Sequence, residues 1–261
     1  MAIDFHSKDN RSSYSSRDAD SSWIQKINEI CDVNGKSVLD IGCGGGIYTK
    51  ALADMGALTV TALDFSEQML STAKGNCKGY PNIRYQLGNA LDTKLEDNQF
   101  DMILERAVIH HISDLDTCFR EAYRILKPGG IYLIQDRTPE DCLLKGDLEN
   151  IRGYFFEKYP SLIEKEVSRR HSEEKVLQSL QKIGFQDTNQ YQLWETRKIY
   201  NTQEELSADI LRRTGRSILH ELNDTQIQDL VNYINSQLII KNNEPIVEKD
   251  KWTIWKAAKP L

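Results

Sequence analysis

The chain has 261 residues, of which 39% are hydrophobic and 28% are charged, and its formal net charge is −6 at pH 7. This composition is typical of a soluble globular protein, and we expect neither a secretory signal nor a membrane span. The negative charge opposes tight binding to nucleic acid, which requires clustered Lys and Arg. The five cysteines form no C-x-x-C pair, which predicts no disulfide framework, no metal site and a reducing, cytoplasmic location.

Short apolar runs alternate with helical stretches from about residue 36 onward. Buried parallel strands are predicted at Ser37–Ile41, Thr59–Asp64, Ile83–Leu87, Phe100–Leu104 and Ile131–Gln135. A helix is predicted over Asp116–Leu126, and the residues K-P-G-G that follow are expected to end it. This alternation predicts an α/β protein with a doubly wound parallel sheet.

The last third of the chain has a different pattern. The expected elements are a helix at Glu173–Lys182 that ends at Gly184, a strand at Phe185–Trp194, helices within Asn201–Ile240 and a strand at Trp252–Ala257. Thr202 and Glu205 predict a capping box at the start of the helical stretch. We expect the last two strands to pair antiparallel at one sheet edge, with the helices inserted between them.

The first predicted strand ends in a glycine-rich turn, V-L-D-I-G-C-G-G-G. A dinucleotide loop beginning at Gly42 and Gly44 would have a third glycine at position 47, which is Ile47. Asp40 precedes the turn and would repel a pyrophosphate, whereas it suits the ammonium group of S-adenosylmethionine (SAM). Asp64 ends the second strand, where an acidic side chain accepts hydrogen bonds from ribose hydroxyls.

Five segments between about residues 36 and 137 together resemble the class I SAM-dependent methyltransferases. They read VLDIGCGGG, TALDFSEQML, LGNALD, FDMILERAVIHHI and LKPGGIYLI. The chain is similar to the small-molecule group that includes trans-aconitate and biotin-pathway methyltransferases. This resemblance implies a seven-stranded, mostly parallel sheet with an antiparallel last strand, SAM as cofactor and a small-molecule acceptor.

The resemblance also implies which residues bind the cofactor. Asp40 and the loop residues Gly42, Cys43 and Gly44 would hold the methionine portion. Asp64 would hold the ribose, and Phe65 and Met69 would enclose adenine. The remaining implied contacts are Asn89, Ala90, Leu91 and Arg106, together with Tyr14 and Arg17 in the amino-terminal segment. Asn89 stands where the family often has an acidic residue, and Arg106 where it often has a small one.

The same resemblance predicts how the chain is divided. Residues 1–35 form an amino-terminal lid segment, 36–137 the SAM-binding core, 138–170 a lid insertion, 171–200 a continuation of the core, 201–245 a helical insertion and 246–261 the final core strand.

Methyl transfer needs a general base only if the acceptor carries a proton at the attacking atom. His111 follows the fourth strand, and the family often has a histidine there, so His111 is the candidate base; a structural histidine is the alternative. Tyr154–Phe156 and Tyr159 could line an acceptor pocket or form the core of the lid. Arg212, Arg213 and Arg216 could bind an anionic group or lie at a solvated helix end.

Three other functions remain possible from the sequence. Tyr154 and Lys158 have the Y-x-x-x-K spacing of a dehydrogenase, but the dinucleotide loop is absent. Enzymes that methylate amino groups of bases or amides often carry an N-P-P-Y-like motif after the fourth strand. This chain has Glu105-Arg106-Ala107-Val108 there, which argues against that chemistry. Another kind of protein or RNA acceptor remains open. A non-catalytic SAM-binding protein is the third. The oligomeric state is not indicated.

Overall fold

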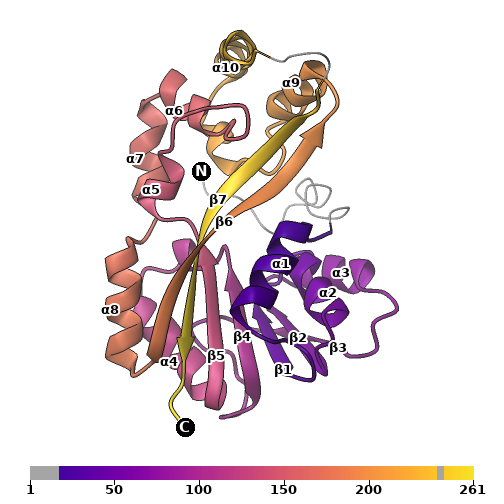
Figure 1. The fold of residues 1–261 in the computed structure, drawn as a ribbon, viewed down its shortest axis with the longest axis vertical. Helices are drawn as coiled ribbons and strands as arrows, with labels where there is room; N and C mark the ends of the chain where they lie inside the picture. Colours follow the sequence, from indigo (N-terminus) through magenta and orange to yellow (C-terminus); the bar gives the residue numbers. More distant parts are fainter. Residues whose placement is uncertain (1–17, 240–243) are drawn as a thin grey trace. The chain divides into compact units, whose positions relative to one another are not determined.

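The fold is described from a computed structural model that covers residues 18–239 and 244–261. Its seven-stranded sheet has the order β3-β2-β1-β4-β5-β7-β6 (Figure 1). The strands are β1 Ser37–Ile41, β2 Thr59–Asp64, β3 Ile83–Leu87, β4 Phe100–Arg106, β5 Leu126–Asp136, β6 Gln186–Tyr200 and β7 Ile246–Ala258. β1 to β5 pair in parallel and β7 pairs antiparallel with β5, which confirms the predicted doubly wound, mostly parallel sheet.

Helices connect most of the strands. They are α1 Ser21–Ile30, α2 Ile47–Asp54, α3 Glu67–Asn76, α4 Leu115–Ile125, α5 Pro139–Cys142, α6 Gly153–Lys158, α7 Ser161–Val167, α8 Glu173–Ile183, α9 Gln203–Leu211 and α10 Asp224–Gln237, with the 3-10 helices η2 Ile109–His111 and η3 Ser217–Glu221. No described helix is both long and apolar enough to cross a membrane.

The predicted elements are correct in kind, and several bounds need correction. β5 begins at Leu126 and includes the K-P-G-G residues, so α4 ends at Ile125, before these residues. β6 and β7 are far longer than predicted, and Figure 1 shows them as two long strands that run in opposite directions. At α9, Thr202 caps the N–H of Glu205 as expected, but the Glu205 carboxylate accepts from the N–H of Asn201, so the box is not reciprocal.

The described residues form two compact units. The core unit comprises residues 18–136, 171–193 and 253–261, and the second unit comprises residues 137–170, 194–239 and 244–252. β6 and β7 contribute to both units because the division falls within these strands.

The core unit is built around the sheet. Phe119 of α4 and Val176 and Leu180 of α8 share one buried cluster with Leu39 of β1 and Ile103 of β4. These apolar positions recur at helical spacing, which explains why α4 and α8 pack on this part of the sheet and on each other. The strand ends are thereby held in a fixed register.

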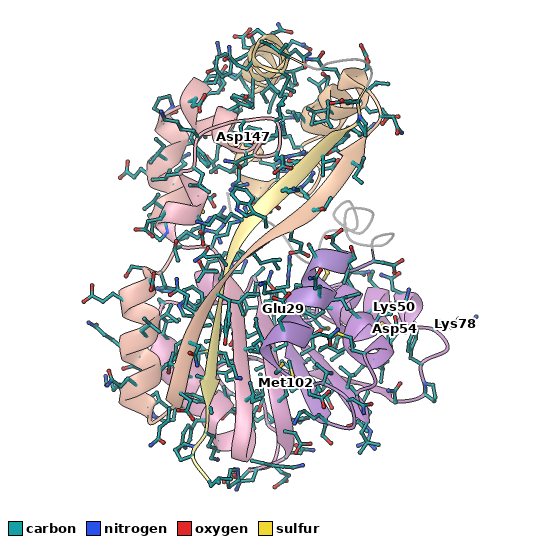
Figure 2. All side chains as sticks on the ribbon, in the orientation of Figure 1. Glu29, Lys50, Asp54, Lys78, Met102 and Asp147 are labelled. Atoms are coloured by element: carbon teal, nitrogen blue, oxygen red, sulfur yellow. The ribbon has the colours of Figure 1, made fainter. Side chains whose placement is uncertain are left out.

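A second set of buried residues includes α1. Trp23 of α1 is fully buried, and its indole Nε1 donates to the Oε1 of Gln135 on β5 at 2.8 Å. Met102 of β4 is also fully buried, and its sulfur lies 4.0 Å from the Sγ of Cys31, directly after α1 (Figure 2). These contacts attach α1 to the sheet.

The second unit has its own apolar core. Phe155 of α6, Leu206 of α9 and Leu230 and Ile234 of α10 belong to one buried cluster, with Tyr154 and Phe156 beside them. The aromatic run Tyr154–Phe156 therefore belongs to the apolar core of the second unit. This burial also places Tyr154 of the Y-x-x-x-K pattern in a packing role.

Candidate functional site

The glycine turn after β1 has a left-handed backbone at three positions. Gly42, Gly44 and Gly46 have φ values of +70°, +52° and +81°, which non-glycine residues rarely adopt. A Cβ on Gly42 would lie 2.3 Å from the Cγ2 of Val108. A Cβ on Gly44 would meet no described heavy atom within 4 Å. The backbone at Gly44 therefore borders open space that a ligand can occupy.

Hydrogen bonds tie this turn to the end of β2. The N–H groups of Gly42 and Cys43 both donate to the carbonyl of Leu63, at 2.8 and 3.0 Å. The Asp64 carboxylate accepts from the N–H of Gly44 through Oδ2 and from the N–H of Ser66 through Oδ1, each at 2.9 Å. Asp64 thus fixes both the turn and the start of α3.

Exposed apolar side chains lie at the ends of β2 and β3 and in the loop that follows β3. Phe65 follows Asp64 directly and is 56% exposed, Leu87 pairs with Asp64 in the sheet and is 48% exposed, and Leu91 is 37% exposed. Large apolar side chains at the carboxyl edge of a parallel sheet suit a flat aromatic ligand. Met69, which is also expected to enclose adenine, is buried in α3, and its N–H donates to the Ser66 hydroxyl.

The loop after β3 contains Asn89, Ala90 and Leu91. The side-chain Oδ1 of Asn89 accepts from the N–H of Leu91 at 2.9 Å, so it forms a local turn. Ala90 is buried in the core cluster, whereas Asn89 is exposed. The loop therefore exposes the side chains of Asn89 and Leu91, whereas the side chain of Ala90 packs into the core.

Asp40 lies at the end of β1, two residues before Gly42. It is buried, and the hydroxyl of Thr49 donates to its Oδ2 at 2.5 Å. Burial raises the pKa of Asp40 to about 7, and the Thr49 hydrogen bond and the positive charge of Arg106 oppose that rise. The Arg106 guanidinium itself lies 4.0 Å from the centre of the Tyr48 ring. Asp40 therefore changes its charge near neutral pH.

The turn after β4 carries two histidines. The His111 side chain is exposed, and its ring centre lies 4.0 Å from that of His110. The Nδ1 of His110 lies 2.8 and 3.0 Å from the two carboxylate oxygens of Asp136, the last residue of β5. The sequence places the candidate base within the segment I-H-H-I, which includes His110, but it assigns no role to Asp136. A signal was present, because Asp136 ends a parallel strand at the same sheet edge as Asp40 and Asp64.

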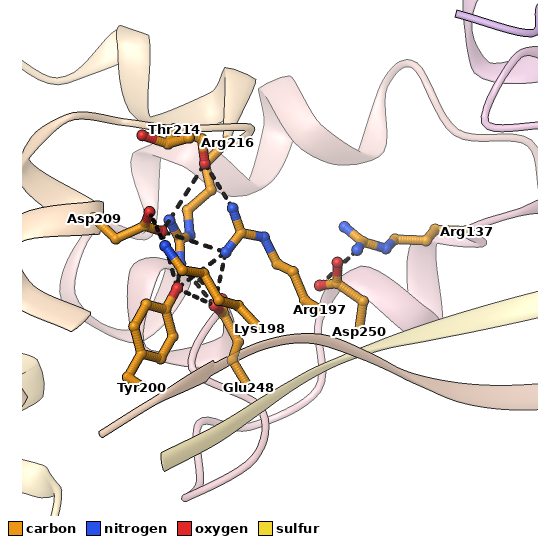
Figure 3. Close-up of polar contacts among 9 residues, drawn as sticks. All are labelled: Arg137, Arg197, Lys198, Tyr200, Asp209, Thr214, Arg216, Glu248 and Asp250. Atoms are coloured by element: carbon orange, nitrogen blue, oxygen red, sulfur yellow. Dashed lines mark hydrogen bonds and ion pairs between the residues drawn. The ribbon is translucent and has the colours of Figure 1, made fainter. Parts of the chain in front are cut away.

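Two of the predicted arginines have partners within the second unit. Arg216 is buried in the second unit, where it binds Asp209 at 2.6 Å and Glu248 at 2.7 Å (Figure 3). Arg213 binds the carbonyls of Leu219 and Leu222, so these two arginines stabilise the second unit.

Two predicted cofactor contacts and the question of a metal site remain to be placed. Tyr14 and Arg17, the implied contacts in the amino-terminal segment, lie outside the described residues. Among residues 18–239 and 244–261, no group of three or more His, Cys, Asp or Glu side chains could hold a metal ion.

Comparisons with known proteins match part of the chain to methyltransferases. Residues 39–134 match the family model described as a methyltransferase domain. A demethylmenaquinone methyltransferase of Bacillus licheniformis is 34% identical over 122 residues, which are 45% of this chain and 53% of that protein. A ubiquinone biosynthesis O-methyltransferase of Pseudomonas entomophila is 35% identical over 126 residues, 46% of this chain and 53% of that protein. The chain thus spans about half the length of the curated relatives that it matches.

Solved structures share the fold. Phosphoethanolamine N-methyltransferase 2 of Haemonchus contortus, solved with SAM, has a TM-score of 0.61 at 22% identity, and the match covers 100% of this chain and 61% of that one. The [4+2]-cyclase SpnF has a TM-score of 0.59 at 20% identity, covering 92% of this chain and 81% of that one. One architecture therefore serves proteins named for different reactions, and the function must be argued from the site.

Proposed function

We propose that this protein binds SAM and transfers its methyl group to a small-molecule acceptor. One observation carries the proposal: the Asp64 carboxylate holds the N–H of Gly44 at a turn that borders open space, next to the exposed side chains of Phe65 and Leu87. The Asp64 carboxylate would suit the ribose hydroxyls of SAM, and the glycine backbone would suit its amino-acid end. The exposed apolar side chains would suit adenine. The methyltransferase domain matched by residues 39–134 contains all of these residues.

The chemistry of the described residues fits this cofactor. Asp64 would accept the ribose hydroxyls, and Asp40 would stabilise the ammonium group. Phe65 and Leu91, together with the exposed amide of Asn89, would contact adenine. Met69 would enclose the adenine ring together with Phe65, as the resemblance implies. Cys43 and the adjacent glycines would supply backbone contacts to the amino-acid end, with Arg106 near Asp40 and, by resemblance, Tyr14 and Arg17.

SAM supplies a methyl group already activated by a positive sulfur. The protein therefore acts mainly by orienting the acceptor, which can lower a barrier by about 7–11 kcal/mol in favourable cases. A base would add about 10²–10⁴-fold for a protic acceptor. His111 is the base implied by resemblance.

A quinone-type acceptor is the proposal that the curated relatives favour, since two of them are named for menaquinone and ubiquinone synthesis. The finer resemblance to trans-aconitate and biotin-pathway enzymes would instead imply an organic acid. A protein or RNA acceptor, or SAM binding without turnover, are the alternatives.

Two measurements on the full chain test the proposed function. Calorimetric titration with SAM is expected to give one site per chain, whereas NAD is expected to give no heat. Transfer of labelled methyl from SAM to a metabolite extract is then expected to produce labelled small molecules. Absence of SAM binding would contradict the proposal, and binding with label only in protein or RNA would support an alternative.

Replacement of Gly44 by Ala separates ligand contact from backbone strain. Ala at this left-handed position is expected to cost about 1–2 kcal/mol of stability and to weaken SAM binding about tenfold, because its Cβ enters the open space. Gly35 is the matched control, since its φ is +71° and an added Cβ meets no described atom within 4 Å. Gly35→Ala is expected to lower stability equally and leave the SAM dissociation constant unchanged, as measured by thermal unfolding and calorimetry. If Gly44→Ala and Gly35→Ala weakened SAM binding equally, SAM would not contact the backbone at Gly44.

The affinity for SAM is expected to depend on pH through Asp40. Because burial raises the pKa of Asp40 to about 7, its carboxyl is mostly neutral near pH 5.5 and mostly ionised near pH 7.5. Only the ionised form attracts an ammonium group, so affinity is expected to increase about tenfold over this interval. Calorimetry in buffers of different ionisation enthalpy would detect proton release on binding at the lower pH. Asp40→Asn is expected to bind SAM weakly, with an affinity that does not depend on pH. If the affinity of the parent protein for SAM also stayed constant between these pH values, Asp40 would not be the partner of the ammonium group.

A further inference from the structure

The contact between His110 and Asp136 has the geometry of an oriented base. Both oxygens of Asp136 lie within 3.0 Å of the Nδ1 of His110, and its Oδ2 also accepts the backbone N–H of His110 at 3.2 Å. Asp136 is almost fully buried, and the ring of His110 is only 11% exposed. A buried carboxylate beside Nδ1 keeps the proton on that nitrogen, so Nε2 becomes the ring's acceptor.

The pair lies at the carboxyl edge of the sheet. Arg106 of β4 pairs with Gln135 of β5, which brings the turn after β4 next to Asp136. Ile41 of β1 pairs with Glu105 of β4, so the glycine turn and the histidine turn leave neighbouring strands. The Nε2 of His171 lies 3.0 and 2.7 Å from the carbonyls of Ile109 and Ile112, which fixes the turn that carries His110. Rigid support of this kind is what a catalytic group requires.

We propose that His110, positioned by Asp136, is the general base of the reaction and that the acceptor is a protic hydroxyl compound such as a phenol or a quinol. This inference rests on the proposed function and deepens it. As the acceptor oxygen bonds to the methyl carbon, its proton passes to Nε2 of His110 and then to water. The carbon–sulfur bond breaks and its electron pair stays on sulfur, so S-adenosylhomocysteine leaves as a neutral thioether.

A base favours an acceptor that carries a proton at the attacking atom, and a hydroxyl compound is the class that we infer. A carboxylate acceptor is already an anion at neutral pH and gains nothing from an oriented imidazole. A hydroxyl acceptor must lose a proton during transfer. The contact between the Asp136 carboxylate and Nδ1 of His110 is the observation that assigns the role of base to His110. Asp136 acts through His110 and is a positioning residue.

Nuclear magnetic resonance of the full chain with ¹⁵N-labelled histidine tests the tautomer without any acceptor. We expect the parent protein to show His110 with its proton on Nδ1. Asp136→Asn is expected to move the proton towards Nε2, because an amide can donate to Nδ1. A proton on Nε2 of His110 in the parent protein would overturn the assignment.

Turnover tests the catalytic role, with catechol and 1,4-dihydroxynaphthalene as hydroxyl probes and trans-aconitate as the carboxylate probe. We expect methylated product from at least one hydroxyl probe and a kcat about 10²–10⁴-fold lower in His110→Asn, with the dissociation constant of SAM unchanged. Asp136→Asn should lower kcat with little change in KM. His220, an exposed histidine of the second unit, is the matched control, and His220→Gln should retain parent activity.

The remaining outcomes overturn the inference in distinct ways. Normal turnover in His110→Asn with a large loss in His111→Gln would assign the base to His111. Methylation of trans-aconitate alone, or of neither hydroxyl probe while SAM binds, would contradict the hydroxyl class and leave the proposed function standing. Failure to bind SAM would contradict the proposed function itself. Thermal unfolding of each variant identifies losses that arise from misfolding.

Discussion

Asp64→Ala is expected to abolish most SAM binding, with a dissociation constant raised by about 10²–10⁴-fold. A hydrogen bond to a charged group contributes about 1.5–3 kcal/mol. Two ribose hydroxyls on one carboxylate therefore account for about 3–6 kcal/mol. The same substitution removes the acceptors for the N–H groups of Gly44 and Ser66, which loosens the turn that borders the ligand.

Calorimetric titration of the full chain with SAM measures this effect. Asp64→Asn keeps the shape and one acceptor oxygen, so its loss of affinity should be smaller than that of Asp64→Ala. Asp229, exposed on α10 of the second unit, supplies the control, and Asp229→Ala should bind SAM as the parent does. An affinity of Asp64→Ala within about threefold of the parent would show that ribose is not held here.

Glu166→Gln is expected to destabilise the second unit by about 3–5 kcal/mol. Glu166 of α7 is fully buried and forms ion pairs with Arg152 at 2.9 Å, with Arg170 at 2.6 Å and with Arg169. These guanidinium groups hold the pKa of Glu166 well below its usual range, against the effect of burial. Neutralising the carboxylate removes the negative charge that faces the guanidinium groups of Arg152 and Arg170. Removing one partner in this way is the costly way to break a buried ion pair.

Urea unfolding at neutral pH measures this loss of stability. Glu164 lies on the same helix and is exposed, so Glu164→Gln is the matched control and should change the free energy of unfolding by less than about 0.5 kcal/mol. Because the pKa of Glu166 is depressed in the folded state, its contribution is present above the unfolded pKa of about 4.3 and is lost as pH falls below it. The difference between parent and Glu166→Gln should therefore shrink in acid. A constant difference would show that packing, and not charge, is responsible.

Several features were predictable from short stretches of sequence. The bounds of β1, β2 and β3 match the predicted strands residue for residue, because each is a short run with Val, Ile, Leu or Tyr that ends at an acidic residue or just before a glycine. The caps of α8 were equally readable, since Ser172 accepts from the N–H of Lys175 and Gly184 ends the helix with a φ of +107°. Such signals depend on neighbours along the chain and need no tertiary contact.

The ends of the long strands were less predictable. β6 continues through Glu195, Arg197 and Lys198, whose polarity suggested that the strand had ended at Trp194. Arg197 is nevertheless nearly buried, and its guanidinium pairs with Glu248 of β7 at 2.8 Å (Figure 3). A charged side chain can lie inside a sheet when an opposite charge faces it, and that partner lies 51 residues away along the chain.

The sequence by itself determined the glycine turn and the two acidic residues beside it, since a strand, a turn and their backbone angles depend on adjacent residues. Only the tertiary structure decided which histidine meets a carboxylate. His110 and Asp136 are 26 residues apart, and they meet because the register of β4 against β5 brings their strand ends together. The tertiary structure likewise decided which arginines pair with Glu166 and Glu248. The sequence shows where charged residues lie along the chain, but which buried charges pair depends on how distant segments pack.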